Sequence, residues 1–402
     1  MRKFIYEAKD GSTGKVVKAA ISAETERAAA KILLKQGFTP LSIKEQESTS
    51  STFSRLRNRV SVKDKVVFTR QLSTLIAAGL PLSQSLRTVV EQTPNVRLKS
   101  VLQDVIESIE GGRSLHDSFA KHPGVFDKLF LALVAVGESS GTLDEALQRV
   151  AAQQEKDAAI LGKIRGAMTY PVIVLFVIFG VLGFMLLTVV PQVEKLYKDL
   201  DKELPLLTQL MVSASNFLIN FWWLVLIVIA TAVYFAVRYI KTPAGIRTYD
   251  SFKLNVPIFG GMFQKLYMAR FNRTGQTLLE SGVAMLDMLK ITSEAVSNTL
   301  ISESILRASE KVRGGKALSV TLKSEDHFPV LVSQMIKIGE QSGRIDEMMG
   351  KTATIYEDEL DEQIRTISTA IEPVLMVVLA IAAGGMVAAI LLPIYGLVGN
   401  MG

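Results

Sequence analysis

The chain contains one sequence pattern twice, and this duplication limits the folds it can adopt. The segment FTRQLSTLIAAGL at 68–80 recurs as FNRTGQTLLESGV at 271–283, an offset of 203 positions. The offset is 202 for GESSG at 137–141, which recurs as GEQSG at 339–343. One unit has therefore been duplicated. A duplicated helical unit indicates a pseudo-symmetric protein built from two similar halves rather than an enzyme with a single cleft.

The positions that the two copies share, together with the joint that ends each copy, are candidates for partner binding or for the architecture. The joint is Tyr170-Pro171 in the first copy and Glu372-Pro373 in the second, so the copies diverge at Glu372. The candidate positions are Arg70, Gly79, Gly137, Glu138, Gly141, Pro171, Arg273, Gly282, Gly339, Glu340, Gly343, Glu372 and Pro373.

Three long apolar runs without a charged residue lie at 172–190, 217–237 and 374–392. Each contains 19 to 21 residues. At a rise of about 1.5 Å per residue, a helix of this length spans a hydrocarbon core of about 30 Å. The sequence therefore predicts three transmembrane helices.

Basic residues beside the apolar runs predict the orientation, because they favour the cytoplasmic side of a membrane. Lys163 and Arg165 precede the first run, and Arg238 and Lys241 follow the second. The loop at 191–216 contains more acidic than basic residues. We expect a cytoplasmic N-terminus, an external loop between the first two spans, and an external C-terminus.

The rest of the chain is expected to be mainly α-helical, except near its start. Alternating apolar residues at Phe4, Tyr6 and Ala8 predict a half-buried strand. We expect a polytopic membrane protein with two repeated cytoplasmic six-helix bundles, three transmembrane helices and a small N-terminal α+β module. The expected segments are the α+β module at 1–45, a linker at 46–60, a first bundle at 61–170, a transmembrane helix at 172–190, an external loop at 191–216, a transmembrane helix at 217–237, a second bundle at 238–371, a transmembrane helix at 374–392 and an external C-terminus at 393–402.

Local signals predict where helices of the first copy begin and continue. Ser61 and Asp64 have the spacing of a capping box, in which each side chain satisfies a backbone amide of the other's turn. Thr142 and Glu145 predict a second capping box. The helix that begins there is expected to continue into the first transmembrane run, with Pro171 as a kink or joint.

The sequence offers no site for common catalytic chemistry. It has no cysteine, and His116, His122 and His327 lack the spacing of metal ligands. The motif Gly314-Gly315-Lys316 does not complete a phosphate-binding loop. The net charge of +6 is modest, and no basic stretch is interleaved with aromatic residues. We therefore expect no enzyme activity, no cofactor, no metal and no nucleic-acid partner.

Glu138 and Glu340 are unusual because each lies near a helix-ending glycine. A negative charge at a helix C-terminus is disfavoured by roughly 0.3–1 kcal/mol, so each carboxylate is expected to have a local partner. One hypothesis is a hydrogen bond to the start of the following helix. The others are a charge that faces a partner protein, or a metal site shared between subunits.

A transporter or channel subunit built from parallel repeats is the alternative function. Transporters also use internal repeats and broken helices. A translocation path usually carries a charged residue inside the membrane, however, and the three apolar runs contain none.

The chain resembles the family of inner-membrane platform proteins that includes the type II secretion F protein and the type IV pilus assembly C protein. The resemblance lies in F-x-R-Q-L-x-T-L-x-x-A-G-L-P-L at 68–82, V-G-E-x-S-G-x-L-D-E at 136–145, Y-P at 170–171, G-E-x-S-G-x-I-D-E at 339–347 and E-P at 372–373. It covers nearly the whole chain.

The resemblance implies a multi-pass protein of the bacterial inner membrane without enzyme activity. It implies that the protein couples a cytoplasmic assembly ATPase to the extraction and polymerisation of pilin or pseudopilin subunits. The implied partners are a hexameric ATPase, those subunits, other inner-membrane assembly proteins and further copies of this chain. The motifs do not separate a pilus from a secretion system.

Overall fold

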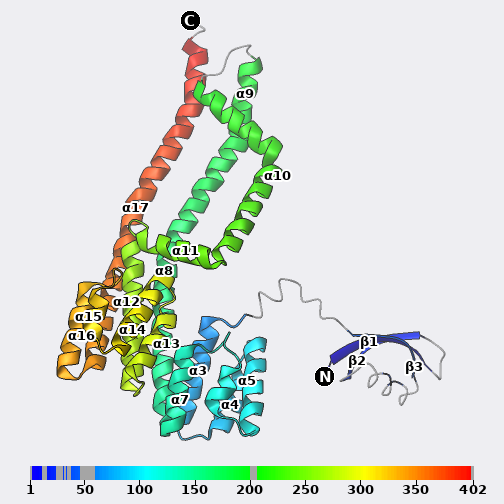
Figure 1. Cartoon of the computed structure of the whole chain (residues 1–402). Helices are drawn as coiled ribbons and strands as arrows, with labels where there is room; N and C mark the ends of the chain where they lie inside the picture. The colour runs from blue at the N-terminus through cyan, green and yellow to red at the C-terminus, as the bar shows by residue number, and fades with distance from the viewer. Residues whose placement is uncertain are drawn as a thin grey trace. The chain divides into compact units, whose positions relative to one another are not determined.

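The computed structural model describes residues 2–10, 16–23, 30, 33, 38–45, 59–199 and 206–399 (Figure 1). The chain divides into two compact units, Met1–Arg59 and Val60–Gly402.

The first unit contains a three-stranded antiparallel sheet in the order β2-β1-β3. Phe4 in β1 pairs with Ile21 in β2, and Tyr6 pairs with Ile43 in β3. The first strand therefore lies where the alternating pattern predicts it. The helical part of the expected α+β module lies outside the described residues apart from residues 30 and 33. The strands are β1 (Arg2–Asp10), β2 (Val16–Ala23) and β3 (Phe38–Glu45).

The first copy of the duplicated pattern forms six helices, as predicted. Ser61 and Asp64 make the expected capping box, in which the Ser61 hydroxyl accepts from the Asp64 amide at 3.1 Å and the Asp64 carboxylate accepts from the Ser61 amide at 2.9 Å. We call these helices the first repeat. They are α3 (Val62–Ala77), α4 (Leu82–Gln92), α5 (Val96–Glu110), α6 (Leu115–Ala120), α7 (Lys128–Ser140) and α8 (Leu143–Phe184).

The second copy forms the corresponding six helices, which we call the second repeat, after one helix that has no counterpart in the first. The additional helix is α11 (Pro243–Asn255). The second repeat is α12 (Gly260–Glu280), α13 (Met285–Ala295), α14 (Thr299–Arg313), α15 (Leu318–Lys323), α16 (Val330–Ser342) and α17 (Ile345–Gly399).

Aromatic side chains fill the centre of each repeat at equivalent places. Phe68, Phe119 and Phe130 are almost fully buried in the first repeat, and Phe271 takes the place of Phe68 in the second. The rings of Phe119 and Phe130 meet edge to face with centroids 5.0 Å apart, a favoured aromatic geometry. The buried apolar residues of the two repeats form one continuous core. The repeats are therefore packed together rather than held as separate bundles.

The predicted capping box at Thr142 is wrong. Thr142 has φ −106° and ψ 42° and makes no side-chain cap, and its hydroxyl lies 2.7 Å from the Ser140 hydroxyl. Only Gly141 and Thr142 separate α7 from α8, and Gly141 takes the left-handed conformation with φ 77°. This tight turn keeps Thr142 out of the extended conformation that an N-cap residue needs.

Among the residues that the structure describes, three helical segments are long and apolar enough to cross a membrane, as predicted: Leu143–Asp199, Thr208–Ile240 and Ile345–Gly385. The helix α8 continues without a break through Pro171, where the kink was expected. Its departure from α geometry comes later, in the π-helical segment η1 (Met185–Val189), before α9 (Val190–Asp199). Because Pro191 in the first turn of α9 lacks an amide donor, a local π turn suits this position.

The second span, α10 (Leu206–Ile240), bends within its length. Phe221 has φ −119° and ψ 22°, which is not helical. In Figure 1, α8 and α17 rise from the helical repeats as long helices, and α10 runs beside them. Both long helices therefore belong to a repeat at one end and to the apolar part at the other.

Candidate functional site at the junction of the two repeats

Glu138 and Glu340 each hold the first turn of a short helix. The Glu138 carboxylate accepts from the amides of Leu115, at 2.6 Å, and His116, at 3.0 Å, which begin α6. The Glu340 carboxylate accepts from the amide of Ser319 in α15 at 3.1 Å and also from its hydroxyl. These amides have no partner inside their own helix and carry a partial positive charge. The charge of each glutamate is thus compensated locally.

This finding corrects the expectation that the glutamates would bond to the following helix. The partner is the preceding short helix, because α6 and α7 are consecutive helices whose chain turns back, so the end of α7 lies beside the start of α6. The shared metal site between subunits stays a prediction. Among the residues that the structure describes, no group of three or more His, Cys, Asp or Glu could hold a metal ion.

The glycine before each of these glutamates allows close helix packing. A Cβ atom on Gly137 would lie 2.6 Å from the Cβ of Ala146, and one on Gly339 would lie 2.7 Å from the Cα of Ile345. Contacts this short are not tolerated in a packed interior. The Gly-Glu pair thus stabilises the same turn in each repeat, which we call the corner. The glycine allows the following helix to pack closely, and the glutamate caps the N-terminus of the preceding short helix.

The candidate arginines make equivalent ion pairs in the two repeats. Arg70 in α3 donates to Glu155 in α8 through Nε, at 2.5 Å, and through Nη2. Arg273 in α12 donates to Glu357 in α17 through Nε at 2.8 Å and Nη2 at 2.7 Å. This two-bond geometry is the strong form of an arginine–carboxylate pair. Each pair fastens the first helix of a repeat to its sixth.

The two pairs differ in their surroundings. The side chains of Arg70 and Glu155 are 45% and 39% exposed, whereas those of Arg273 and Glu357 are 14% and 18% exposed. Lys156, in α8 of the first repeat, contacts Glu357 of the more buried pair. The Arg70–Glu155 pair is exposed to solvent, so the two copies of this contact differ in their surroundings.

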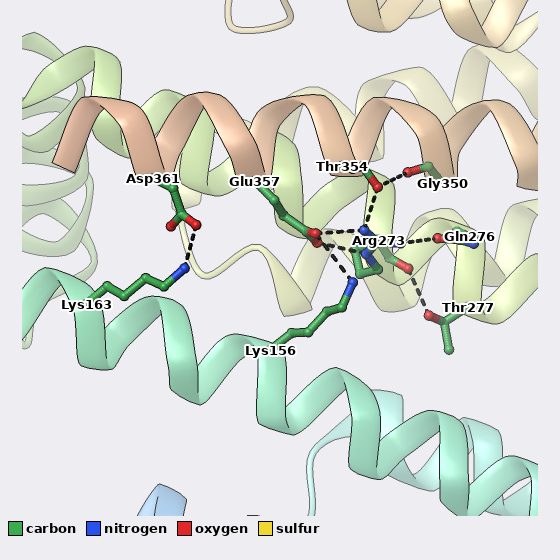
Figure 2. A network of polar contacts seen from close by, with 9 residues as sticks. All are labelled: Lys156, Lys163, Arg273, Gln276, Thr277, Gly350, Thr354, Glu357 and Asp361. Atoms are coloured by element: carbon green, nitrogen blue, oxygen red, sulfur yellow. Dashed lines mark hydrogen bonds and ion pairs between the residues drawn. The ribbon is translucent and has the colours of Figure 1, made fainter. Parts of the chain in front are cut away.

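Lysines of α8 reach carboxylates of α17 and thereby join the two repeats. Figure 2 shows Lys156 with its Nζ 3.4 Å from Glu357 Oε2, and Lys163 with its Nζ 2.5 Å from Asp361 Oδ2. Arg273 also donates from Nη1 to the Gln276 side chain at 2.7 Å. We call Lys156, Lys163, Arg273, Glu357 and Asp361 the crossing network.

The crossing network lies on the parts of α8 and α17 that lead into the apolar spans. Lys163 and Asp361 are about two to four helical turns before the apolar runs that begin at 172 and 374. A displacement of one repeat would therefore reach both spans through two helices that are joined by ion pairs.

The remaining candidates lie elsewhere. Gly79 and Gly282 end α3 and α12 with φ of 84° and 82°. Pro171 and Pro373 lie inside α8 and α17. Glu372 is exposed and makes no hydrogen bond or ion pair with any described residue. The structure therefore brings Arg273 into the crossing network and leaves the membrane joint outside it.

A further polar contact has the same place in both repeats, but the carboxylate lies on the longer helix in the first repeat and after the short helix in the second. In the first repeat, His122 Nε2 lies 2.6 Å from Asp104 in α5. In the second, Glu325 lies 2.6 Å from Arg307 and 3.0 Å from Lys311, both in α14. Burial acts to raise the pKa of Glu325, but hydrogen bonds from Arg307 and Lys311 outweigh it, so the pKa lies below its ordinary value of 4.5.

Sequence reasoning missed the partners of the arginines. Glu155 and Glu357 were not singled out, although they lie 202 positions apart, the same offset as the glutamates of the Gly-Glu pairs. That offset was sufficient to find them. Lys163 and Asp361 are 198 positions apart and follow no repeat offset, so the sequence contains no comparable signal for them.

Comparison with known proteins agrees with the duplicated pattern. A family model described as type II secretion system protein F matches residues 68–191 and again 273–393. A second model, for the N-terminal domain of type II secretion system protein F, matches residues 1–44. The two matches of the first model correspond to the two repeats with their following spans.

Full-length relatives are found in both pilus and secretion systems. The type IV pilus assembly protein PilC of Thermus thermophilus is 38% identical, covering 100% of this chain and 99% of the relative. PilC of Pseudomonas aeruginosa is 36% identical over 92% of this chain and 98% of the relative. The type II secretion system protein F of Vibrio cholerae is 32% identical over 98% of each chain.

Proposed function

Because this chain belongs to the type II secretion system protein F family, we propose that it couples a cytoplasmic assembly ATPase to the extraction and polymerisation of pilin or pseudopilin subunits. In this role the chain is an inner-membrane platform protein of a type IV pilus or type II secretion machine. Full-length similarity to proteins named for both machines supports this role. Three apolar helices suit a protein that acts in the membrane.

The observation that carries the proposal is the path from the helical repeats into the membrane. The helices α8 and α17 are 42 and 55 residues long, and each begins in a repeat and continues into a candidate span. The pair Lys163–Asp361 joins them near the apolar segments. A push on the repeats by a partner ATPase would be transmitted along these helices, because an α-helix is a continuous hydrogen-bonded rod.

We propose that the repeats lie in the cytoplasm, where they meet the hexameric ATPase, and that the C-terminus is external. The spans and the external loop would then meet the subunits and other inner-membrane assembly proteins. Further copies of the chain would complete the platform. Basic residues such as Arg165 and Lys241 at the repeat end of the spans support this orientation.

A pilus machine is the preferred assignment between the two systems. Pilus relatives share 33–38% identity with this chain, and secretion relatives share 32–34%. The difference is modest and concerns which subunits are handled rather than how the platform works.

A deletion strain tests the proposal. We expect it to lack surface pili by electron microscopy, with exoprotein secretion unchanged, and we expect a plasmid copy of the gene to restore the pili. Loss of secretion with normal pili would assign the chain to a secretion machine. A deletion strain with normal pili and normal secretion would contradict the proposal, and transport of ions or solutes by the reconstituted chain alone would then favour a transporter.

A further inference from the structure

An apolar cavity of about 310 Å³ lies where the helical repeats meet the spans. Four helices line it, with Ala167 from α8, Phe252 from α11, Met262 from α12 and Ile367 from α17. Lys253 is the charged residue in its lining. The wall is thus formed by both repeats and by the additional helix α11.

If the hydrocarbon core begins at residues 172 and 374, the cavity lies at the outer edge of the headgroup layer. Ala167 and Ile367 precede the apolar runs that begin at 172 and 374, by about 8 and 11 Å along a helix. The polar headgroup layer is about 5–8 Å thick on each side of the hydrocarbon core. A lipid at the edge of the bilayer is therefore within reach of the cavity.

The helix α11 has the features of a helix that lies in the membrane surface. Its apolar residues Ile246, Tyr249 and Phe252 are exposed and spaced three apart, and Phe252 is 64% exposed. Such a row is typical of interfacial helices. The opposite side is anchored, because the buried Asp250 accepts from the Thr299 amide at 2.9 Å and its hydroxyl at 2.8 Å. Phe252 and Tyr249 both belong to the exposed row and to the cavity wall.

Basic residues lie close in sequence to the residues that line the cavity. Arg165 follows Ile164 in α8, Arg365 follows Ile364 in α17, and Lys241 precedes α11; none of these basic residues makes an ion pair with a described residue. Lys253 Nζ lies 3.2 Å from Asp250, which partly offsets its charge. Glu362 and Glu372 are the acidic residues near Arg365 on α17 that make no ion pair with a described residue. The three basic residues outnumber these two, which favours an anionic ligand, and each basic residue near a membrane surface attracts anionic lipid by about 1 kcal/mol.

We propose that this cavity binds one acyl chain of an anionic membrane lipid, whose headgroup is held by the basic residues around it. A thin, flexible acyl chain matches the apolar lining, and part of its length would enter the cavity of about 310 Å³. The bound lipid would fasten α11 and both long helices to the membrane surface.

Native mass spectrometry of the purified full-length protein in detergent tests this proposal. The probes are dioleoyl phosphatidylglycerol and dioleoyl phosphatidylcholine at equal concentrations. We expect wild type to retain one phosphatidylglycerol in preference to phosphatidylcholine. The substitutions Ala167→Trp and Met168→Trp, which fill the cavity, should abolish retention, whereas Val177→Trp, on the exposed surface of the same helix, should not.

The substitutions Arg165→Gln and Arg365→Gln test the binding of the lipid headgroup. Each should lower the preference for phosphatidylglycerol by roughly fivefold, while glycerophosphoglycerol, which has no acyl chains, should not displace the lipid. Size-exclusion elution and the helical circular dichroism signal identify folded variants. Equal retention by folded Met168→Trp and Val177→Trp, or no retained lipid in wild type, would overturn the proposal.

Discussion

Arg273 and Glu357 share two hydrogen bonds, from Nε at 2.8 Å and from Nη2 at 2.7 Å, and Lys156 of the other repeat reaches the same carboxylate. The equivalent pair Arg70–Glu155 has no such third member among the described residues and is more exposed. One duplicated contact has thus become the junction between repeats, and the other has remained a surface contact.

The Arg273–Glu357 and Arg70–Glu155 pairs should therefore contribute differently to the free energy of unfolding. Glu357→Gln should lower the free energy of unfolding by about 3 kcal/mol, because it leaves half-buried cations without their partner. Glu155→Gln should lower it by less than about 1 kcal/mol, as for exposed pairs. Denaturant unfolding of the detergent-solubilised protein, followed by circular dichroism, measures both. Equal effects of the two substitutions would contradict the asymmetry.

The corner glycines give a sharper steric prediction. Gly137→Ala and Gly339→Ala should each destabilise the protein by about 1–3 kcal/mol, because the added methyl group meets the adjacent helix. Gly166→Ala in α8 is the matched control, since nothing lies within 4 Å of its Cβ position. It should be neutral or slightly stabilising. Thermal unfolding of the three variants compares them directly, and a neutral Gly339→Ala would show that the corner is not tightly packed.

The glutamates next to these glycines should act as helix caps. Glu138→Ala and Glu340→Ala should each cost about 1–2 kcal/mol, because the first turn of α6 or α15 loses its acceptor. Glu340→Gln keeps an acceptor and should cost less. Hydrogen exchange should increase at the amides of Leu115, His116 and Ser319, which the glutamates accept from. If exchange there is unchanged and assembly fails, the carboxylates face a partner instead.

Glu325 should make the free energy of unfolding depend on pH in the acidic range. Its pKa is lowered in the folded protein, so its contribution is full above the ordinary value of 4.5 and is lost as the pH falls below that value. Glu325→Gln should be less stable than wild type near neutral pH and should lose less stability on acidification to about pH 4. Unfolding midpoints across this range measure the difference. Parallel pH profiles for both proteins would rule out this role.

Much of the helical architecture could be predicted from the sequence, because its signals are local or repeat at a constant offset. The Ser61–Asp64 capping box depends on residues within one turn. The three apolar runs are recognisable by length alone. The predicted capping box at Thr142 was wrong because the tight turn at Gly141 keeps Thr142 out of the N-cap conformation.

The candidate site was only partly predictable. Arg70 and Arg273 were found through the duplication, but their partners were not sought at the same offset. The contact between Lys163 and Asp361 joins positions 198 apart and arises from the packing of one repeat on the other. No periodicity or spacing encodes such a contact, so only the folded chain reveals it.

The central claim is that ion pairs between α8 and α17 transmit movement of the repeats to the spans, and a charge exchange at Lys163 and Asp361 tests it most directly. Lys163→Asp and Asp361→Lys, each introduced alone into the chromosomal gene, should reduce the number of surface pili at unchanged membrane levels of the protein. The double exchange should restore pili towards wild type, because the pair is re-formed with reversed charges. Normal pili in both single variants, or a double variant no better than either single one, would contradict the claim.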